Sequence, residues 1–243
     1  MCGVTGTNGK TSCTQWLAQI LEHYQRPCAV IGAVGNGFIG RLEPSTHTTP
    51  DALKMQQLLA HFRGEGATHL AMEVSSHGLH QGRVNGVKFD CAVMTNLTRD
   101  HLDYHGSMEA YAEAKARLFE WHGLGTAVLN ADDAFTTSLV AADRISAEQL
   151  LRYGFSWGAE IRASSLKLAA NGFVLDISTP WGPVTLETAL LGRFNAYNLM
   201  AVTGAALAAG ISLDQIAAMA PQIQPAVGRM QTLGGLGQPL VVI

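Results

Sequence analysis

The sequence of 243 residues is poor in charged side chains, which make up 14% of it against roughly 25% in an ordinary globular domain. Its formal net charge is −3, so it lacks the basic excess that binds a nucleic-acid backbone, and we expect no nucleic-acid partner. It also lacks long apolar runs. The longest, residues 199–211, is shorter than the roughly 20 residues of a membrane span, so we expect no membrane segment.

Cysteines and targeting signals are equally sparse. The four cysteines form no C-x-x-C pair and lie in apolar surroundings, which predicts reduced core thiols of a cytosolic protein and no zinc site. No basic stretch followed by an apolar one opens the sequence, so we expect no secretory signal and a cytoplasmic location. The last apolar stretch, 239–243, begins a strand with nothing after it. We therefore expect one domain of a longer protein.

What the sequence does contain is 47% hydrophobic residues, which excludes a disordered chain. Short apolar runs alternate with helical segments, and this alternation predicts an α/β fold with a mostly parallel sheet flanked by helices. Thr49 is expected to cap a helix that begins at Pro50. The expected strands are 29–31, 69–74, 89–94 and 127–129, and the expected helices are 10–24, 50–62, 108–121 and 132–141.

The pattern changes near residue 150. Residues 160–168, 173–178 and 183–190 are strand-like and are separated by the turn pairs Asn-Gly and Trp-Gly, which predicts a small antiparallel β-sheet inserted near 158–192. Residues 195–209 return to a helical pattern. Ser212 and Gln215 have the spacing of a capping box and predict the start of a further helix.

Residues 3–11 read G-V-T-G-T-N-G-K-T, which is the strongest local signal for chemistry. Glycines allow backbone N–H groups to converge on phosphate oxygens, and a helix N-terminus adds positive potential. Lys10 would supply a point charge to the phosphates, and Thr11 would place its hydroxyl on Mg²⁺. Val4 stands where the strict pattern has glycine, so this is a variant phosphate loop. The alternative is an ordinary glycine turn before a helix.

Two polar groups follow expected buried strands. Glu73 ends one strand, at the edge where α/β sheets bind ligands, and a buried carboxylate there needs a metal or a cation to offset its charge. An arginine-paired glutamate is the alternative. Residues 100–105, D-H-L-D-Y-H, follow another strand and hold two histidines and two carboxylates, which can ligate metal. A solvated polar loop is the alternative.

Three further residues are candidates. Lys115 lies one helical turn after Tyr111, and this spacing alone indicates an ordinary surface lysine. Asn195 is expected to cap the next helix. Asn198, three residues later, could present its amide to the edge of a nucleotide base.

Taken together, the motifs E-V-S-S-H-G-L at 73–79 and T-N-L-T-R-D-H-L-D-Y-H-G at 95–106 resemble the central ATP-binding domain of the Mur ligases, and most of all the MurE group. The resemblance covers 1–243 as one domain, without the family's N-terminal uridine-binding and C-terminal amino-acid-binding domains. It implies an ATP-dependent ligase of peptidoglycan synthesis that adds diaminopimelate or lysine to UDP-N-acetylmuramoyl-L-alanyl-D-glutamate through an acyl phosphate. It also implies a monomer in the bacterial cytoplasm, with the UDP-muramoyl dipeptide and an amino acid as its partners.

The same resemblance assigns roles to individual residues. It implies ATP, two Mg²⁺ ions and a carbamate on Lys115 as cofactors. Gln231 departs from the family, which often has glutamate there. The implied catalytic residues are Lys10, Glu73, His101, Lys115 and Arg229; the implied ATP contacts are Gly6, Thr7, Asn8, Gly9, Lys10, Thr11, Asn195, Asn198 and Arg229; the implied metal ligands are Thr11, Glu73, His101 and Lys115; and the implied substrate contacts are Thr48, Thr49, Ser75, Gln81 and Arg83.

Three alternatives stay open at this point. A P-loop switch protein would have an N-K-x-D motif, and the nearest candidate, residues 96–99, lacks its lysine and aspartate. A nucleotide-binding module without turnover would keep the phosphate loop but perform no ligation. Another ligase of the same superfamily, such as folylpolyglutamate synthase, would share the phosphate loop, but the run at 73–79 favours the MurE group.

Overall fold

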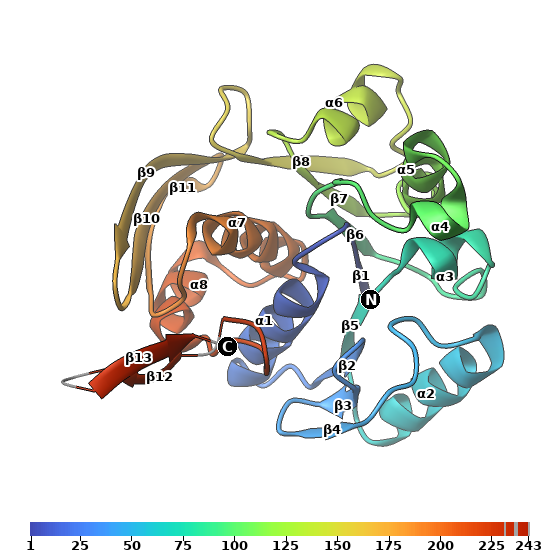
Figure 1. Cartoon of the computed structure of the whole chain (residues 1–243), viewed down its shortest axis with the longest axis horizontal. Helices are drawn as coiled ribbons and strands as arrows, with labels where there is room; N and C mark the ends of the chain where they lie inside the picture. The colour runs from blue at the N-terminus through green and yellow to red at the C-terminus, as the bar shows by residue number, and fades with distance from the viewer. Residues whose placement is uncertain (231, 236–237, 243) are drawn as a thin grey trace.

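The computed structural model describes residues 1–230, 232–235 and 238–242, so the departure at Gln231 and the end of the last expected strand at Ile243 lie outside the described residues. Most strands belong to one 11-stranded sheet with the order β11-β10-β9-β8-β7-β6-β1-β5-β2-β3-β4 (Figure 1). The strands are β1 (Cys2–Thr5), β2 (Cys28–Ile31), β3 (Asn36–Phe38), β4 (Arg41–Glu43), β5 (His69–Glu73), β6 (Cys91–Met94), β7 (Thr126–Asn130), β8 (Gln149–Gly154), β9 (Ile161–Ala169), β10 (Gly172–Thr179), β11 (Gly182–Thr188), β12 (Thr232–Gly235) and β13 (Gln238–Val242).

Helices cover both faces of this sheet (Figure 1). One hydrophobic core lies between the sheet and helices α1, α7 and α8, and a second lies between the sheet and α2, α5 and α6. The helices are α1 (Lys10–His23), α2 (Ala52–Gly64), α3 (Ser76–His80), α4 (Leu102–His105), α5 (Met108–Ala116), α6 (Ala134–Ala141), α7 (Arg193–Ala208) and α8 (Leu213–Met219), followed by a 3₁₀ turn at Ala220–Gln222.

Strand β1 lies at the centre of the parallel part, between β5 and β6. All its residues are buried, because each face of the strand meets one of the two cores. Within β2, for example, Val30 belongs to one core and Ile31 to the other, as the alternation of side chains along a strand requires. The predicted α/β fold with a mostly parallel sheet is confirmed.

Strands β9, β10 and β11 pair antiparallel, as predicted for the region near 158–192. They join the main sheet through a short parallel pairing of β8 with β9, in which Tyr153 lies opposite Ile161. Figure 1 shows these three strands curving round α7 and α8. Helix α7 is therefore enclosed by the sheet on more than one side, and most of its residues are buried.

Several helix boundaries differ from the expectations. Helix α2 is capped by Asp51, whose carboxylate accepts from the N–H groups of Leu53 and Lys54, so Thr49 and Pro50 precede the helix. Helix α5 ends at Ala116 rather than at residue 121. Helix α6 begins at Ala134 because Asp133, and not Asp132, accepts the first free N–H groups.

Other elements were absent from the sequence-based expectation: β8, the β3–β4 hairpin and the short helices α3 and α4. The predicted capping box is confirmed, because the side chains of Ser212 and Gln215 bond reciprocally at the start of α8. The four cysteines are buried with free thiols, and burial raises the pKa of Cys13 and Cys28, which disfavours the reactive thiolate. In the described part of the chain, we find no helix with the length and apolarity of a membrane crossing.

Candidate functional site

The phosphate loop joins the central strand β1 to helix α1, and its shape depends on two glycines. Gly6 has φ 141°, and a Cβ there would come within 1.9 Å of the Thr95 hydroxyl oxygen. Gly9 has φ 88° and stands directly before the helix, where a Cβ would come within 2.4 Å of Oδ1 of Asn198. Both positions need glycine because the left-handed backbone and the close neighbours leave no room for a side chain.

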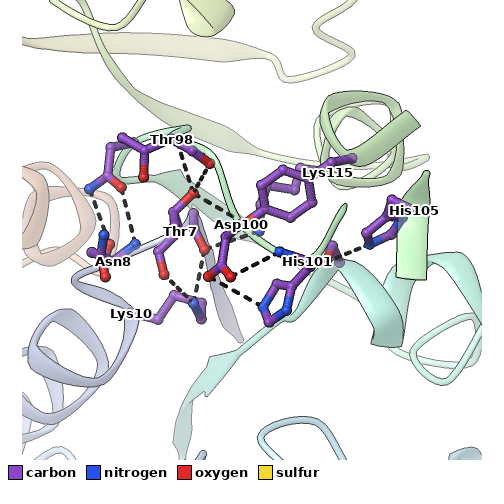
Figure 2. Close-up of polar contacts among 12 residues, drawn as sticks. Thr7, Asn8, Lys10, Thr98, Asp100, His101, His105 and Lys115 are labelled. Carbon is purple, nitrogen blue, oxygen red and sulfur yellow. Dashed lines mark hydrogen bonds and ion pairs between the residues drawn. The ribbon is translucent and has the colours of Figure 1, made fainter. Parts of the chain in front are cut away.

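Residues of the loop after β6 hold the phosphate loop in place. The backbone N–H of Thr7 donates to the carbonyl oxygen of Asn96 at 2.8 Å. The N–H of Asn8 donates to Oδ1 of the same asparagine at 3.0 Å. The third hydrogen bond runs from the N–H of Thr98 to the Thr7 hydroxyl, at 2.9 Å (Figure 2). Three hydrogen bonds therefore fix the loop to its neighbour.

Lys10 opens α1 and folds back over the loop. Its Nζ donates to the carbonyl oxygens of Gly6 and Thr7, each at 2.9 Å. Burial lowers the pKa of Lys10, and the negative charges of Glu73 and Asp100 partly offset that effect. This cation thus lies where the loop's backbone N–H groups and a helix N-terminus converge, which is the arrangement that binds phosphate.

Thr11 and Glu73 form a buried pair beside Lys10. The Thr11 hydroxyl donates to Oε1 of Glu73 at 3.0 Å, and the N–H of Ala33 donates to the same oxygen at 2.9 Å. Glu73 is 2% exposed, and burial raises its pKa. Among the described residues, no lysine or arginine forms an ion pair with Glu73, so the arginine-paired alternative is not what the structure shows.

Lys115 is 1% exposed, so the expectation of a surface lysine from spacing alone is wrong. Its Nζ donates to the carbonyl oxygen of Gly6 at 3.0 Å and lies 4.6 Å from the centre of the Tyr111 ring. Burial, and then the charge of Lys10, holds the pKa of Lys115 well below its usual range. A lysine in these surroundings gives up its proton more readily than an exposed one, and the deprotonated amine is its nucleophilic form.

His101 and Asp100 lie on the same side of the loop, and Figure 2 shows them between Lys10 and Lys115. The carboxylate of Asp100 accepts the backbone N–H of His101 at 2.9 Å and lies 3.6 Å from its Nε2. His101 has φ 50°, a left-handed conformation that is uncommon for histidine. Burial lowers the pKa of both Lys10 and Lys115, and the negative charge of Asp100 opposes this lowering for each of them.

A cavity of about 800 Å³ lies in front of the loop. Its wall includes the loop, Glu73, Thr48 and Arg229, together with the first turns of α7. Of the expected site residues, the cavity brings together Thr7, Asn8, Gly9, Lys10, Thr11, Thr48, Glu73, Asn195, Asn198 and Arg229, whereas Gly6, Thr49, Ser75, Gln81, Arg83, His101 and Lys115 are outside its wall.

The two asparagines of α7 face this cavity, but Asn195 does not cap the helix as expected. Gly192 precedes α7, and Asn195 lies in its first turn with Nδ2 donating to the Leu191 carbonyl oxygen at 2.8 Å. Oδ1 of Asn195 accepts from Nδ2 of Asn198 at 3.1 Å. The pair is thereby fixed in one orientation, with Asn198 next to Gly9 of the phosphate loop.

Four of the five expected substrate residues, Thr49, Ser75, Gln81 and Arg83, form one hydrogen-bonded group next to Glu73, and Thr48 lies in the cavity wall. The Thr49 hydroxyl donates to the carbonyl oxygen of Glu73 at 2.9 Å and accepts from the N–H of Ser75 at 2.9 Å. Arg83 donates to the Thr49 carbonyl oxygen at 2.8 Å and to Oε1 of Gln81 at 2.9 and 2.6 Å. These polar groups therefore extend from the buried carboxylate to the surface near α3.

The sequence matches the family model described as the Mur ligase middle domain over residues 4–206. The chain belongs to the Mur ligase family. Among its relatives, the UDP-N-acetylmuramoyl-L-alanyl-D-glutamate–2,6-diaminopimelate ligase of Chromobacterium violaceum is 54% identical over 241 residues, which are 99% of this chain and 49% of the relative.

The ligase of the same name from Neisseria meningitidis serogroup B is 51% identical over 243 residues, with 99% of this chain and 49% of the relative covered. A solved structure of a protein with this name has a TM-score of 0.90 at 41% identity and covers 96% of this chain and 48% of its own. This Mur ligase chain thus spans about half the length of the curated relatives it matches.

Several residues of this Mur ligase middle domain were missed as contributors to the site. Thr95 and Asn130 line the cavity, and so does Tyr197 on α7. The Tyr111 ring packs against Nζ of Lys115, and the Tyr111 hydroxyl shares a 3.1 Å hydrogen bond with the Thr7 hydroxyl. The spacing of Tyr111 and Lys115 was the one local signal for this support, because the partners of the others are distant in sequence.

Proposed function

We propose that this chain is the ATP-binding domain, 1–243, of a MurE-type ligase with a small β subdomain near 158–192. The enzyme would add the third residue, diaminopimelate or lysine, to UDP-N-acetylmuramoyl-L-alanyl-D-glutamate. The names of the relatives support diaminopimelate, and they favour this activity over that of a folylpolyglutamate synthase. As the resemblance implies, we expect it to act as a monomer in the bacterial cytoplasm.

One observation carries the proposal: a phosphate loop with Lys10, Thr11 and the buried Glu73 opens into a cavity large enough for a nucleotide, and the buried amine of Lys115 touches the same loop. Phosphoryl transfer to a carboxylate depends on positioning and charge neutralisation. The loop and Lys10 would position the phosphates, and the Thr11–Glu73 pair and Lys115 lie beside them for charge neutralisation.

In this proposal the loop residues Gly6, Thr7, Asn8 and Gly9 bind the triphosphate of ATP through backbone N–H groups. Lys10 and Arg229, which both line the cavity, neutralise its charge. Asn195 and Asn198, at the α7 end, contact the adenosine. The γ-phosphoryl group passes to the side-chain carboxylate of D-glutamate, ADP leaves, and the amine of the incoming amino acid displaces phosphate from the acyl phosphate to form the amide.

The donor set fits magnesium. The Thr11 hydroxyl and the Glu73 carboxylate lie 3.0 Å apart and offer the oxygen ligands that Mg²⁺ prefers. Burial raises the pKa of Glu73, and a bound cation would offset the cost of its buried charge. Thr11 and Glu73 would hold one ion, and His101 with a modified Lys115 would hold the second. When bound, the two ions would offset the negative charge of ATP and the substrate carboxylate.

Lys115 suits carbamylation because its amine is buried and burial lowers its pKa, which favours the deprotonated form that reacts. The Nζ lone pair attacks CO₂, a C–N bond forms, and one proton is released, so that the side chain becomes an anion. An ammonium beside Mg²⁺ would be repelled, whereas a carbamate would be attracted. The nearby charge of Lys10 lowers the pKa of Lys115 and would stabilise the carbamate by the same Coulomb interaction.

The muramoyl dipeptide would bind at the group formed by Thr48, Thr49, Ser75, Gln81 and Arg83. Arg83 carries the positive charge in this group, which suits an anionic nucleotide-peptide substrate. Thr49 connects the group to the backbone of Glu73, so a carboxylate bound there would lie near Glu73 and Thr11, the residues that would hold one magnesium ion.

The test is an assay of the full-length protein for ADP release in the presence of ATP, Mg²⁺, the muramoyl dipeptide and each amino acid in turn. We expect release to require the dipeptide and one amino acid, with ATP preferred over GTP. Lys10→Ala should abolish turnover, whereas Lys167→Ala, at an exposed position of β9, should leave it unchanged. Turnover retained by Lys10→Ala would refute the phosphate loop, and ATP binding without amide formation would favour a module without turnover.

A further inference from the structure

A chain of polar contacts runs behind the cavity, from the phosphate loop to helix α7. The Thr95 hydroxyl donates to the Asn8 carbonyl oxygen, and the Thr95 carbonyl oxygen accepts from Nδ2 of Asn130 at 2.8 Å. Oδ1 of Asn130 accepts from the N–H of Asp132 at 3.0 Å. Oδ2 of Asp132 then accepts from the Tyr197 hydroxyl at 2.8 Å. The two walls of the nucleotide cavity are therefore connected through side chains from β7 and the loop after β6.

Asp132 is the residue on which several of these contacts converge. Its Oδ2 also accepts from the N–H of Phe155 at 2.7 Å, and its Oδ1 accepts from the N–H of Ser156 at 3.0 Å. A Cβ at Gly154 would come within 2.7 Å of Oδ2, so the strand end approaches the carboxylate closely. Burial raises the pKa of Asp132, but the hydrogen bonds outweigh it and the pKa is lowered, which keeps the carboxylate charged.

Helix α7 has a particular need for this contact. No side chain of the described residues caps its N-terminus, and the residue before it is Gly192. Tyr197 lies between the two asparagines on this helix, and its ring lies 5.1 Å from that of Phe155. The guanidinium group of Arg193 stacks on the Phe155 ring, with its carbon atom 4.0 Å from the centre of that ring. The first turns of α7 are thus held against the β8 end by Tyr197 and Arg193 together.

We propose that Asp132 and Tyr197 are a positioning pair, which holds Asn195 and Asn198 against the phosphate loop and so sets the affinity for the nucleotide. The pair takes no part in phosphoryl transfer. This inference rests on the proposed function only for the identity of the ligand, an adenine nucleotide, because the pair would position the asparagines for any ligand of that cavity.

The experiment compares Tyr197→Phe with Tyr24→Phe in the full-length protein. Each loses one hydroxyl that donates a 2.8 Å hydrogen bond, in Tyr24 to the carbonyl oxygen of Gln215, away from the cavity. Calorimetric titration with a non-hydrolysable ATP analogue and Mg²⁺ should show about tenfold weaker binding for Tyr197→Phe and unchanged binding for Tyr24→Phe.

Steady-state kinetics separate positioning from a general loss of structure. Tyr197→Phe should raise the KM for ATP by the same factor, with kcat within about twofold and the KM for the muramoyl dipeptide unchanged. Asp132→Asn places an amide N–H₂ group among three hydrogen-bond donors, so it should weaken binding of the ATP analogue at least as much as Tyr197→Phe does. The double variant should bind the analogue no more weakly than Asp132→Asn alone.

The outcomes distinguish this pair from the proposed function. If Tyr197→Phe binds the analogue as tightly as the wild type, the positioning pair is refuted while ligase activity can still stand. If the wild type binds the analogue and forms no amide, the proposed function fails, and weaker binding by Tyr197→Phe still supports the pair. A wild type that does not bind the analogue overturns both.

Discussion

The Nζ of Lys115 donates a hydrogen bond at 3.0 Å to the carbonyl oxygen of Gly6, which lies 109 positions earlier in the sequence. Lys10 donates to the same oxygen from the other side at 2.9 Å. Two amines thus share one backbone acceptor, and the more buried of them has its pKa lowered partly by the charge of the other. The two lysines therefore disfavour each other's charge, and the lowering of the pKa is larger for Lys115.

The first prediction concerns the activity that depends on Lys115. Lys115→Ala should lower turnover at least about 100-fold, because the carboxylate that carbamylation supplies is lost from the site. Short carboxylic acids such as formate or acetate should partly restore it by occupying the space left beside Tyr111. The measurement is ADP release against acid concentration. An absence of rescue at every concentration would count against the carbamate.

The second prediction separates the charge of Lys115 from its catalytic role. A base with a lowered pKa binds fewer protons in the folded than in the unfolded protein, so stability rises with pH between the folded pKa and 10.5. Replacing it by a neutral side chain of similar length, Lys115→Met, should remove this dependence, which is at most about 1.4 kcal/mol per pH unit.

Urea unfolding in CO₂-free buffer at pH 7 and pH 9.5 measures this effect. We expect the wild type to gain more stability than Lys115→Met on going to the higher pH. Equal gains for the two proteins would show that the amine is solvated and charged in the folded state.

The third prediction concerns magnesium at Glu73. Glu73→Gln keeps the shape of the side chain and an acceptor for Thr11 and Ala33 but removes the negative charge. Because burial raises the pKa of Glu73, the neutral amide should leave the melting temperature without metal unchanged or higher. The stabilisation that Mg²⁺ and an ATP analogue give the wild type should be lost.

The matched control for this variant is Glu187→Gln, at an exposed position of β11. It should respond to Mg²⁺ and the analogue as the wild type does. A Glu73→Gln protein that is still stabilised by the metal complex would remove Glu73 from the set of magnesium ligands.

The fourth prediction uses two glycines with nearly the same backbone. Gly9 and Gly40 have φ of 88° and 86°, so alanine at either should destabilise the fold by about 1 kcal/mol. At Gly9 the new methyl group would also meet Oδ1 of Asn198 at 2.4 Å, whereas at Gly40 it would meet no described atom within 4 Å. Gly9→Ala alone should weaken binding of an ATP analogue, by more than about tenfold. Equal binding by the two variants would contradict the contact between the loop and α7.

The parts of the fold predicted correctly are those whose signals are local. The glycine-containing loop between β1 and α1 and the buried strands follow from composition within a few residues, and the capping box at Ser212 needs only its own first turn. Thr49 was the wrong helix cap because its hydroxyl is used elsewhere, between the Glu73 carbonyl oxygen and the Ser75 N–H. Asp51 lies two residues later and accepts two N–H groups of α2 instead.

The site was predicted less completely, because its contacts join distant segments. The burial of Lys115 depends on β1, β6 and α5 packing together, and spacing within one helix cannot show that. The resemblance named Lys115 where the pattern did not. Asp132 was expected inside a helix, since its partners Phe155 and Ser156 directly follow β8, a strand that was not predicted.

The position of β1 in the sheet has a consequence for synthesis. This strand is the first in the sequence, yet it pairs with β5 and β6, and the loop after it is shaped by Asn96, Thr98 and Lys115. A nascent chain can therefore complete its phosphate loop only after more than about a hundred residues have left the ribosome. Until β5 and β6 have also been synthesised, the apolar β1 lacks its neighbours in the sheet, and such a segment is the kind that chaperones protect.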